Sequence, residues 1–423
     1  MINTFLVLMY KLLLDILFYF YVYPIYGSEP YFAEYGSADF LKWLIASVLT
    51  VAIWLFMSRL YSRDTRPSVF FILVQFFIII VPSLVLFGMQ DRPYFHVLLL
   101  CSAFFLLNMI VRLMPNIRIP PPPALLAFGL VAIGLICITY VYIGLISTGG
   151  VSRFNFDFYS VYDVREKYKM EMLPWFDYFV PWVAYVINMA FLVYFYSKKI
   201  WFLVFLVVVA QLLLFGMTNF KSFLFLPIVV LGIIVVRKYL TQPRLILLGL
   251  FASIGAGLVI NAAGEDMGMS MVRRVLFVPG ALHGLYFDYF SANPSAAMAG
   301  TRFAYFFSSH YDVNSIDLIA RYFWGTKINP DVGWVGDAFS QFGWAGVIVY
   351  TIILAVLLKI TDSLATGIPY PHTQKIEGMI VGVAIVLCES ALFTTLLTHG
   401  FIILLVAFWI LSYFWRRRPL TGC

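Results

Sequence analysis

The sequence is poor in charge, cysteine and histidine, and each shortage excludes a class of protein. Of its 423 residues, 12% are charged, whereas soluble globular chains carry about a quarter, so a soluble fold is excluded. The four cysteines form no CxxC or Cys/His spacing, which supports neither a disulfide framework nor a structural metal. We therefore expect no metal and no other cofactor. The net charge of +7 comes without a basic recognition motif, so we expect no nucleic-acid partner.

The sequence is instead rich in long apolar runs. Hydrophobic residues make up 62% of the chain, and the mean hydropathy is +0.92. A helix needs about 20 apolar residues to cross the hydrocarbon core of a bilayer. Twelve runs approach that length, at residues 3–24, 38–57, 69–89, 94–114, 124–147, 175–196, 200–216, 222–236, 244–262, 341–360, 378–398 and 400–415. The chain is therefore predicted to be an all-α polytopic membrane protein, with about 12 transmembrane helices in a single integral-membrane domain, residues 1–423.

Positive charges alternate along the chain and predict its orientation. Lysines and arginines follow the second, fourth, sixth, eighth and twelfth runs, whereas the alternate short connections carry acids or are nearly neutral. In membrane proteins the cytoplasmic loops hold the excess of lysine and arginine. We therefore predict that both termini are cytoplasmic. Two long segments then lie on the outer face, a first loop at 148–174 and a large loop at 263–340.

The large outer loop is predicted to be partly helical and to carry the active site. Residues 271–278 indicate a short helix that Pro279-Gly280 stops. Residues 315–324 indicate a second helix, with Ser315 placed to cap its start and Gly325 to end it. We expect this loop to fold against the membrane surface.

Lys221 lies at the outer turn between two short apolar runs and begins the second of them. The first N–H groups of a helix and the positive end of its dipole attract anions, and a lysine there adds a full charge. Lys221 is therefore a candidate ligand for phosphate. The alternative is a lysine that only extends from the bilayer interface into water.

Arginines of the large loop are further candidates for binding a pyrophosphate. Arg273 and Arg274 are adjacent on a predicted helix, so their side chains point about 100° apart and only one can face a given ligand squarely. A charge-assisted bond from arginine to a phosphate contributes roughly 1.5–3 kcal/mol. Arg302 and Arg321 are weaker candidates, because Arg321 lies four residues after Asp317 and could pair with it. Contact with lipid headgroups is the alternative for the arginine pair.

Aromatic and basic residues of the outer segments suggest glycan contacts. Arg153 and Arg165 are interleaved with aromatic residues in the first outer loop, and Tyr286 lies in the large one. Aromatic rings can lie under sugar rings, and cations can hold acidic substituents. A belt of aromatic residues at the membrane surface explains the same composition.

Several acids and histidines could act as the catalytic base. Asp337 precedes the tenth run, where it is either a general base or a partner of the helix dipole. His283 and His310 are the alternatives in the large loop, and His399 lies at the outer end of the eleventh run. Apart from these candidate bases, Glu389 is an acid inside a run, which makes it a functional candidate by default. It has no second acid with which to form an ion path, and this argues against a transporter.

Three stretches of the sequence resemble the Wzy-type O-antigen polymerases, which polymerise lipid-linked oligosaccharide repeat units. They are residues 218–227 (TNFKSFLFLP), 273–290 (RRVLFVPGALHGLYFDYF) and 329–346 (NPDVGWVGDAFSQFGWAG). The layout is also similar, with many spans and one dominant outer loop late in the chain.

The resemblance implies a metal-independent glycosyltransferase in the bacterial inner membrane, with its active site on the periplasmic side. It would move a growing glycan from undecaprenyl pyrophosphate onto the non-reducing end of an acceptor repeat unit. The implied partners are the lipid-linked donor and acceptor, membrane lipid and a chain-length regulator protein. Related ligases place a basic residue where Lys221 lies and an arginine where Arg273 or Arg274 lies. Their catalytic histidine has no clear match, since Asp337 stands in that region.

Two other functions stay open. An O-antigen ligase would use the same donor but lipid A core as acceptor. A lipid-linked glycan flippase would line a cavity within its spans with cations, whereas here the spans contain almost no arginine. For the polymerase we predict that Lys221→Ala and Arg273→Ala each abolish polymerisation while the protein still inserts normally.

Overall fold

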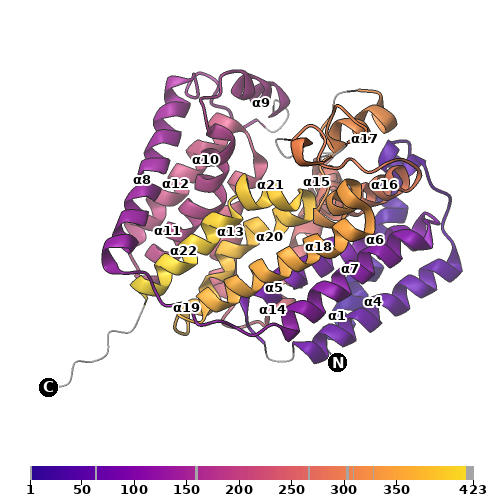
Figure 1. Cartoon of the computed structure of the whole chain (residues 1–423), viewed down its shortest axis with the longest axis horizontal. Coiled ribbons are helices and arrows are strands. Elements are labelled where there is room, and N and C mark those ends of the chain that lie inside the picture. The colour runs from indigo at the N-terminus through magenta and orange to yellow at the C-terminus, as the bar shows by residue number, and fades with distance from the viewer. Residues whose placement is uncertain are drawn as a thin grey trace.

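The computed structural model describes residues 2–61, 64–157, 161–264, 267–301, 304–307, 309–326 and 328–415. Within these ranges the protein is all-helical, with 77% of its residues in helices and no strand (Figure 1). The predicted fold class is therefore confirmed at the level of an all-α protein with many apolar helices.

Ten helical segments of the described ranges are long and apolar enough to cross a membrane. They are Ile2–Tyr26, α4 (Phe40–Leu60), Pro67–Met89, α7 (Tyr94–Leu113), α8 (Ala124–Ser147), Phe176–Ser197, α12 (Trp201–Thr218), α14 (Gln242–Ala262), α18 (Trp334–Ala365) and Leu392–Phe414. The segments Ile2–Tyr26, Pro67–Met89 and Phe176–Ser197 each contain a five-residue π-helical turn between two α-helices. These helices are α1 (Ile2–Leu17) and α2 (Tyr23–Tyr26), α5 (Pro67–Gln75) and α6 (Val81–Met89), and α10 (Phe176–Trp182) and α11 (Asn188–Ser197).

Two of the twelve predicted runs differ from the others, so the count of twelve stays a prediction. The run at 222–236 corresponds to α13 (Lys221–Val236), which has 16 residues. The run at 378–398 is divided into α20 (Glu377–Glu389) and α21 (Leu392–Leu397), and α22 (Phe401–Phe414) follows.

Shorter helices occupy the two long outer segments. The first segment contains α9 (Val161–Met170). The large one contains α15 (Met267–Leu276), α16 (Val278–Ala292), a single 3₁₀ turn (Ala304–Phe306) and α17 (Ser315–Trp324). The remaining short helices are α3 (Pro30–Ala33) and α19 (His372–Lys375).

The predicted helix at 271–278 was wrong in its bounds and in the role of its proline. Pro279 lies in the first turn of α16, where its missing N–H would have no helical partner, so it begins a helix and does not stop one. The helix predicted at 315–324 is confirmed. Its start is capped by Asn314, whose side chain accepts a 2.8 Å hydrogen bond from the N–H of Asp317, and not by Ser315. Gly325 ends it at φ +63°, as predicted.

Helix α18 begins earlier than the predicted tenth run and is kinked. It starts at Trp334, and Phe342 and Gly343 interrupt it with non-helical dihedral angles. Gly343 has a φ of +58°, which a glycine adopts without strain. The predicted start of this run at 341 therefore coincides with the kink, and the last turns of the predicted loop are already helical.

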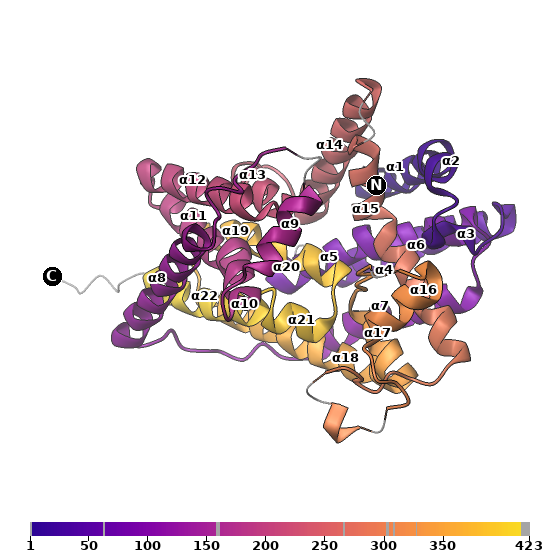
Figure 2. The ribbon, with the colours of Figure 1, turned by 90° about the horizontal axis from the view of Figure 1, so that it is seen from above.

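The segment Pro67–Met89 forms the centre of the bundle, because every residue of its most apolar stretch is buried. Helix α5 contacts both α18 and α20, and α6 contacts α4. Figures 1 and 2 both place α8, α10, α11 and α12 on one side of this centre, and α4 and α7 on the other. Helix α20 runs between the two sides.

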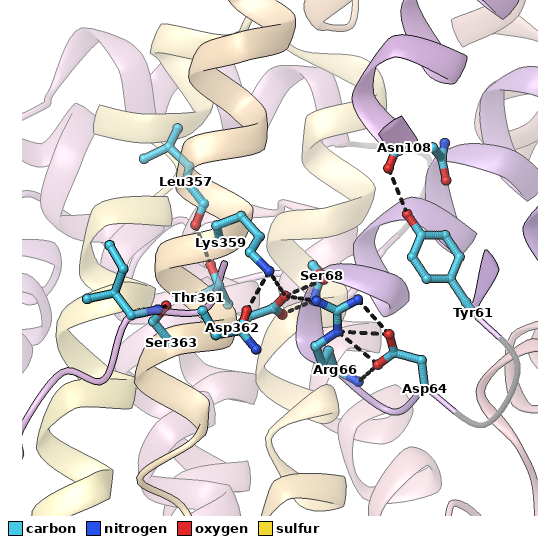
Figure 3. Close-up of polar contacts among 12 residues, drawn as sticks. Tyr61, Asp64, Arg66, Ser68, Asn108, Leu357, Lys359, Thr361, Asp362 and Ser363 are labelled. Atoms are coloured by element: carbon cyan, nitrogen blue, oxygen red, sulfur yellow. Dashed lines mark hydrogen bonds and ion pairs between the residues drawn. The ribbon is translucent and has the colours of Figure 1, made fainter. Parts of the chain in front are cut away.

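Two faces of the molecule can be distinguished in Figure 1. We call the face that carries α9 and α17 the loop face, and the one near α19 and the N-terminus the opposite face. The opposite face contains a network of paired charges (Figure 3). Asp362 accepts hydrogen bonds from the N–H (2.9 Å) and the hydroxyl (2.7 Å) of Ser68. The guanidinium of Arg66 and the amine of Lys359 lie 3.4 Å and 3.8 Å from the same carboxylate.

Candidate functional site

Two basic side chains meet at the turn between α12 and α13. Asn219 ends α12 with a φ of +56°, and Lys221 begins α13 two residues later. Helix α9 lies against this turn, because Arg165 donates a 3.2 Å hydrogen bond to the Asn219 carbonyl. The Arg165 guanidinium also lies 4.7 Å from the centre of the Phe220 ring. These contacts bring the charge of Arg165 within electrostatic range of Lys221.

Helix α15 adds a third cation from a distant part of the chain. It folds back along α14 where Gly257 and Gly268 meet so closely that neither position has room for a side chain. Arg274, near the end of α15, is exposed and within electrostatic range of Lys221. Positive charges from α9, α13 and α15 are therefore gathered at one place.

The adjacent arginines of α15 point in different directions, as their spacing predicted. Arg273 forms an ion pair with Glu29, and its guanidinium lies 4.0 Å from the centre of the Tyr26 ring. Of the two arginines proposed as pyrophosphate ligands, the structure thus brings Arg274 to Lys221 and holds Arg273 in an internal pair.

An acid, Glu389, lies within electrostatic range of Arg274 and is the last residue of α20. Its carboxylate is half-buried and lies within electrostatic range of Arg274 and of Asp331. No hydrogen bond or ion pair to this carboxylate is formed by the residues that the structure describes. Most buried polar groups have such partners, so an acid without one is unusual.

The position of Glu389 is fixed by a break in the helix. Ser390 (φ −135°, ψ 153°) and Ala391 (φ −53°, ψ 148°) are extended and separate α20 from α21. Asp331 holds this break, because it accepts a 2.8 Å hydrogen bond from the Ser390 hydroxyl and a further one from the N–H of Ala391. Burial raises the pKa of Asp331 to about 6.

Tyr185 lies between the turn that carries Lys221 and the end of α20. Its hydroxyl shares a 2.8 Å hydrogen bond with the hydroxyl of Ser222, and it is within electrostatic range of both Glu389 and Arg165. A cavity of about 180 Å³ adjoins this tyrosine. Its walls include Tyr168, Phe176, Tyr185, Phe220, Phe223 and His399. His399, predicted to be able to reach the site, thus lines a cavity next to it.

Three predicted site residues are buried in the protein interior. His283 forms a 2.7 Å hydrogen bond with the Pro279 carbonyl, and burial lowers the pKa of this imidazole to about 4. The Tyr286 hydroxyl donates to the Pro330 carbonyl at 3.0 Å, so its ring supports the segment before α18. Asp337 lies in the first turn of α18, as predicted, and accepts a 3.2 Å hydrogen bond from Gln341. These contacts are internal.

The other predicted residues have partners inside the protein, are exposed or lie outside the described ranges. Arg153 is buried, donates to the Met217 carbonyl at 3.0 Å and pairs with Glu171. Its donors are therefore used inside the protein. His310 and Arg321 are exposed. Arg302 lies outside the residues that the structure describes.

From the sequence, Arg165 was a candidate for contact with the glycan, and neither Glu389 nor Asp331 was included in the site. The one sequence signal for Glu389 was its position as an acid in an apolar run. Asp331 gave no signal, because its partners Ser390 and Ala391 lie 59 and 60 residues away in the sequence. Helix α9 packs over the turn and so places Arg165 within electrostatic range of Lys221. The separation of these two residues in the sequence does not reveal this contact.

Comparison of the chain with family models, with curated proteins and with solved structures gave no match. The function must therefore be argued from the site itself. Among the residues described, no group of three or more His, Cys, Asp or Glu side chains could hold a metal ion. The chemistry available is that of three cations, one acid without a partner and an adjoining aromatic cavity.

Proposed function

We propose that the protein polymerises lipid-linked oligosaccharide repeat units. It transfers a growing glycan from undecaprenyl pyrophosphate onto the non-reducing end of an acceptor repeat unit and releases undecaprenyl pyrophosphate. The observation that carries the proposal is the gathering of Lys221, Arg165 and Arg274 from three separate helices, with the half-buried acid Glu389 within electrostatic range of Arg274. The resemblance of the sequence to O-antigen polymerases supports it.

The chemistry of the reaction explains why such cations are needed. As the bond between the sugar and the pyrophosphate breaks, negative charge grows on the pyrophosphate. Fixed cations at a site with little water stabilise that charge more in the transition state than in the ground state, and this lowers the barrier. Three charge-assisted bonds of roughly 1.5–3 kcal/mol each are enough to matter for the rate.

The location of the cations suits a lipid-linked donor. Lys221 begins an apolar helix, so the free N–H groups of that helix add to the attraction for phosphate. The polyprenyl tail of such a donor remains in the bilayer, beside the apolar helices, while its pyrophosphate lies at their ends. In this proposal the loop face is periplasmic and the membrane is the bacterial inner membrane.

The experiment that tests this function uses the purified protein in liposomes with lipid-linked repeat units and no translocation partner. The expected result is a ladder of longer glycans on the undecaprenyl carrier. Lys221→Ala and Arg274→Ala should lose this ladder, whereas Arg321→Ala, a change at an exposed arginine of the same outer segment, should keep it. Ladders of normal length in both cation variants would remove the proposed site.

The same experiment separates the alternatives. A ligase would leave the repeat units unpolymerised and would transfer glycan to added lipid A core. A flippase would move repeat units across the liposome membrane without lengthening them. The cations gather at the starts and ends of helices and on short outer helices, and this favours a transferase over a transporter.

A further inference from the structure

Glu389 differs from the other acids in the interior of the protein. Each of the others has a named partner: Asp15 pairs with Lys11, Glu377 with Arg237, Asp362 with Ser68 and Arg66, Asp337 with Gln341, and Asp331 with Ser390. The described residues offer the Glu389 carboxylate no hydrogen bond. Because Glu389 is only half-buried, its carboxylate stays accessible to a bound substrate, and an acid at the end of an apolar run is a functional candidate.

Neighbouring residues fix the position of Glu389. The hydrogen bonds of Asp331 to Ser390 and Ala391 fix the backbone directly after it, so α20 cannot continue and move the carboxylate away. The end of α20 lies near Arg274, and Arg274 lies near Lys221. A pyrophosphate bound by these cations therefore brings the sugar attached to it close to this carboxylate.

We propose that Glu389 is the general base of the transfer reaction, the group that takes the proton from the attacking hydroxyl of the acceptor sugar. This inference rests on the proposed function. The acceptor oxygen forms a bond to the anomeric carbon of the donor sugar while the bond from that carbon to the pyrophosphate oxygen breaks. The electron pair of the broken bond leaves with undecaprenyl pyrophosphate, and the acceptor proton goes to Glu389 and then to water.

The charged and titratable groups that face Glu389 come from four places. Arg274 on α15 favours its ionised form, and Asp331 in the segment before α18 opposes it. Tyr185 and the neighbouring thiol of Cys388 are the other two. Asp331 has a role of its own in this scheme as a positioning residue, because it acts through the backbone that carries Glu389.

The test compares two glutamates at the ends of one helix. Glu389→Gln keeps the size of the side chain but cannot accept a proton, and we expect kcat to fall by about 10²- to 10⁴-fold. The KM for the lipid-linked donor should stay unchanged. We expect the activity of the native protein to fall at low pH, where Glu389 is protonated, and this fall should disappear in the residual activity of Glu389→Gln. Glu377→Gln, at the other end of α20, should leave kcat within about threefold, since Glu377 is held in an internal pair.

A small acid should replace the missing carboxylate. Added formate or azide is expected to restore part of the rate to Glu389→Ala but none to Lys221→Ala, because the second variant lacks a cation. Thermal unfolding in detergent identifies any variant that fails to fold. If Glu389→Ala fails to fold, the kcat of Glu389→Gln alone tests the role of Glu389 as base.

Failure of this inference is distinguishable from failure of the proposed function. If Glu389→Gln keeps its kcat while Lys221→Ala and Arg274→Ala are inactive, the polymerase stands and the base lies elsewhere. If the native protein lengthens no glycan, the function itself is wrong. Loss of donor affinity in Glu389→Gln with an unchanged kcat would assign Glu389 to binding and overturn its role as base.

Discussion

The two ends of helix α20 each carry a glutamate, and the two carboxylates differ in their hydrogen-bond partners. Glu377 is buried and accepts hydrogen bonds from Arg237 (2.5 Å) and Gln242 (2.8 Å). Glu389, 12 residues later, receives none from the residues described. A buried acid at a purely structural position needs such partners, because the desolvation of its charge is costly. Glu389 is only half-buried, so its carboxylate remains accessible without such partners.

The two faces of the molecule show the same contrast on a larger scale. On the opposite face, the Asp362 carboxylate is surrounded by Ser68, Arg66 and Lys359, and opposite charges lie next to each other (Figure 3). On the loop face, like charges gather instead, as Arg165 and Arg274 approach Lys221. Like charges repel, so the pyrophosphate of the proposed donor would stabilise this arrangement on binding.

The largest expected effect distinguishes the two adjacent arginines of α15. Arg274→Ala should lower the rate of polymer formation by about 100-fold or more, because three charge-assisted bonds become two at a developing charge. Arg273→Ala should instead lower the temperature of unfolding, since it leaves Glu29 without its partner. This replaces the prediction from sequence that Arg273→Ala abolishes polymerisation. Rates in liposomes and thermal unfolding in detergent measure the two effects, and equal loss of rate in both variants would contradict the assignment.

A second prediction turns Glu377 into an acid without a partner. Arg237→Met removes the main partner of Glu377 and should lower the free energy of unfolding by about 3–5 kcal/mol, because a buried charge is left uncompensated. The double variant Arg237→Met/Glu377→Leu should recover most of that loss, since neither charge remains. Chemical denaturation in detergent gives both values. If the double variant does not recover this free energy, the ion pair contributes more to stability than the mutual neutralisation of its two charges.

A smaller effect is expected in the network of Figure 3. Ser68→Ala removes the hydroxyl that donates to Asp362 at 2.7 Å but keeps the donation from the Ser68 backbone. Loss of one hydrogen bond to a charged group should lower the free energy of unfolding by roughly 1.5–3 kcal/mol and leave the rate unchanged. A large loss of rate would show that the network of the opposite face takes part in function.

The smallest expected effect is on the pH dependence of stability. Burial raises the pKa of Asp331 to about 6 in the folded protein, above its ordinary value. The folded state therefore holds the proton more tightly than the unfolded chain does, and the stability this gives is fully present below about pH 4 and lost as the pH rises through about 6. Asp331→Asn should flatten this part of the curve. Thermal unfolding between pH 4 and 7 measures it, and an unchanged slope would contradict the prediction.

The parts of the fold that depend on local sequence could be predicted. The apolar runs predicted the long helices, and Gly325 predicted the end of α17. The adjacent positions of Arg273 and Arg274 predicted that their side chains have different neighbours. Pro279 was misread, because the same residue can begin a helix or interrupt one, and its neighbours do not decide which.

The parts of the site that depend on distant contacts could not be predicted. The break after Glu389 exists because Asp331, from another part of the chain, holds Ser390 and Ala391. Whether an acid has a partner is likewise set by long-range packing, so the sequence could not rank Glu389 above Asp337. It offered Asp337 as a catalytic base and Glu389 only as an acid in an apolar run, and the structure distinguishes them by what surrounds each carboxylate.

The end of α20 at Glu389 has an electrostatic consequence for the neighbouring cation. A helix concentrates about half an elementary negative charge at its C-terminal carbonyl groups. Glu389 is the last residue of α20 and lies within electrostatic range of Arg274. The backbone at this helix end therefore supplies Arg274 with a permanent partial counter-charge, which does not depend on any bound anion.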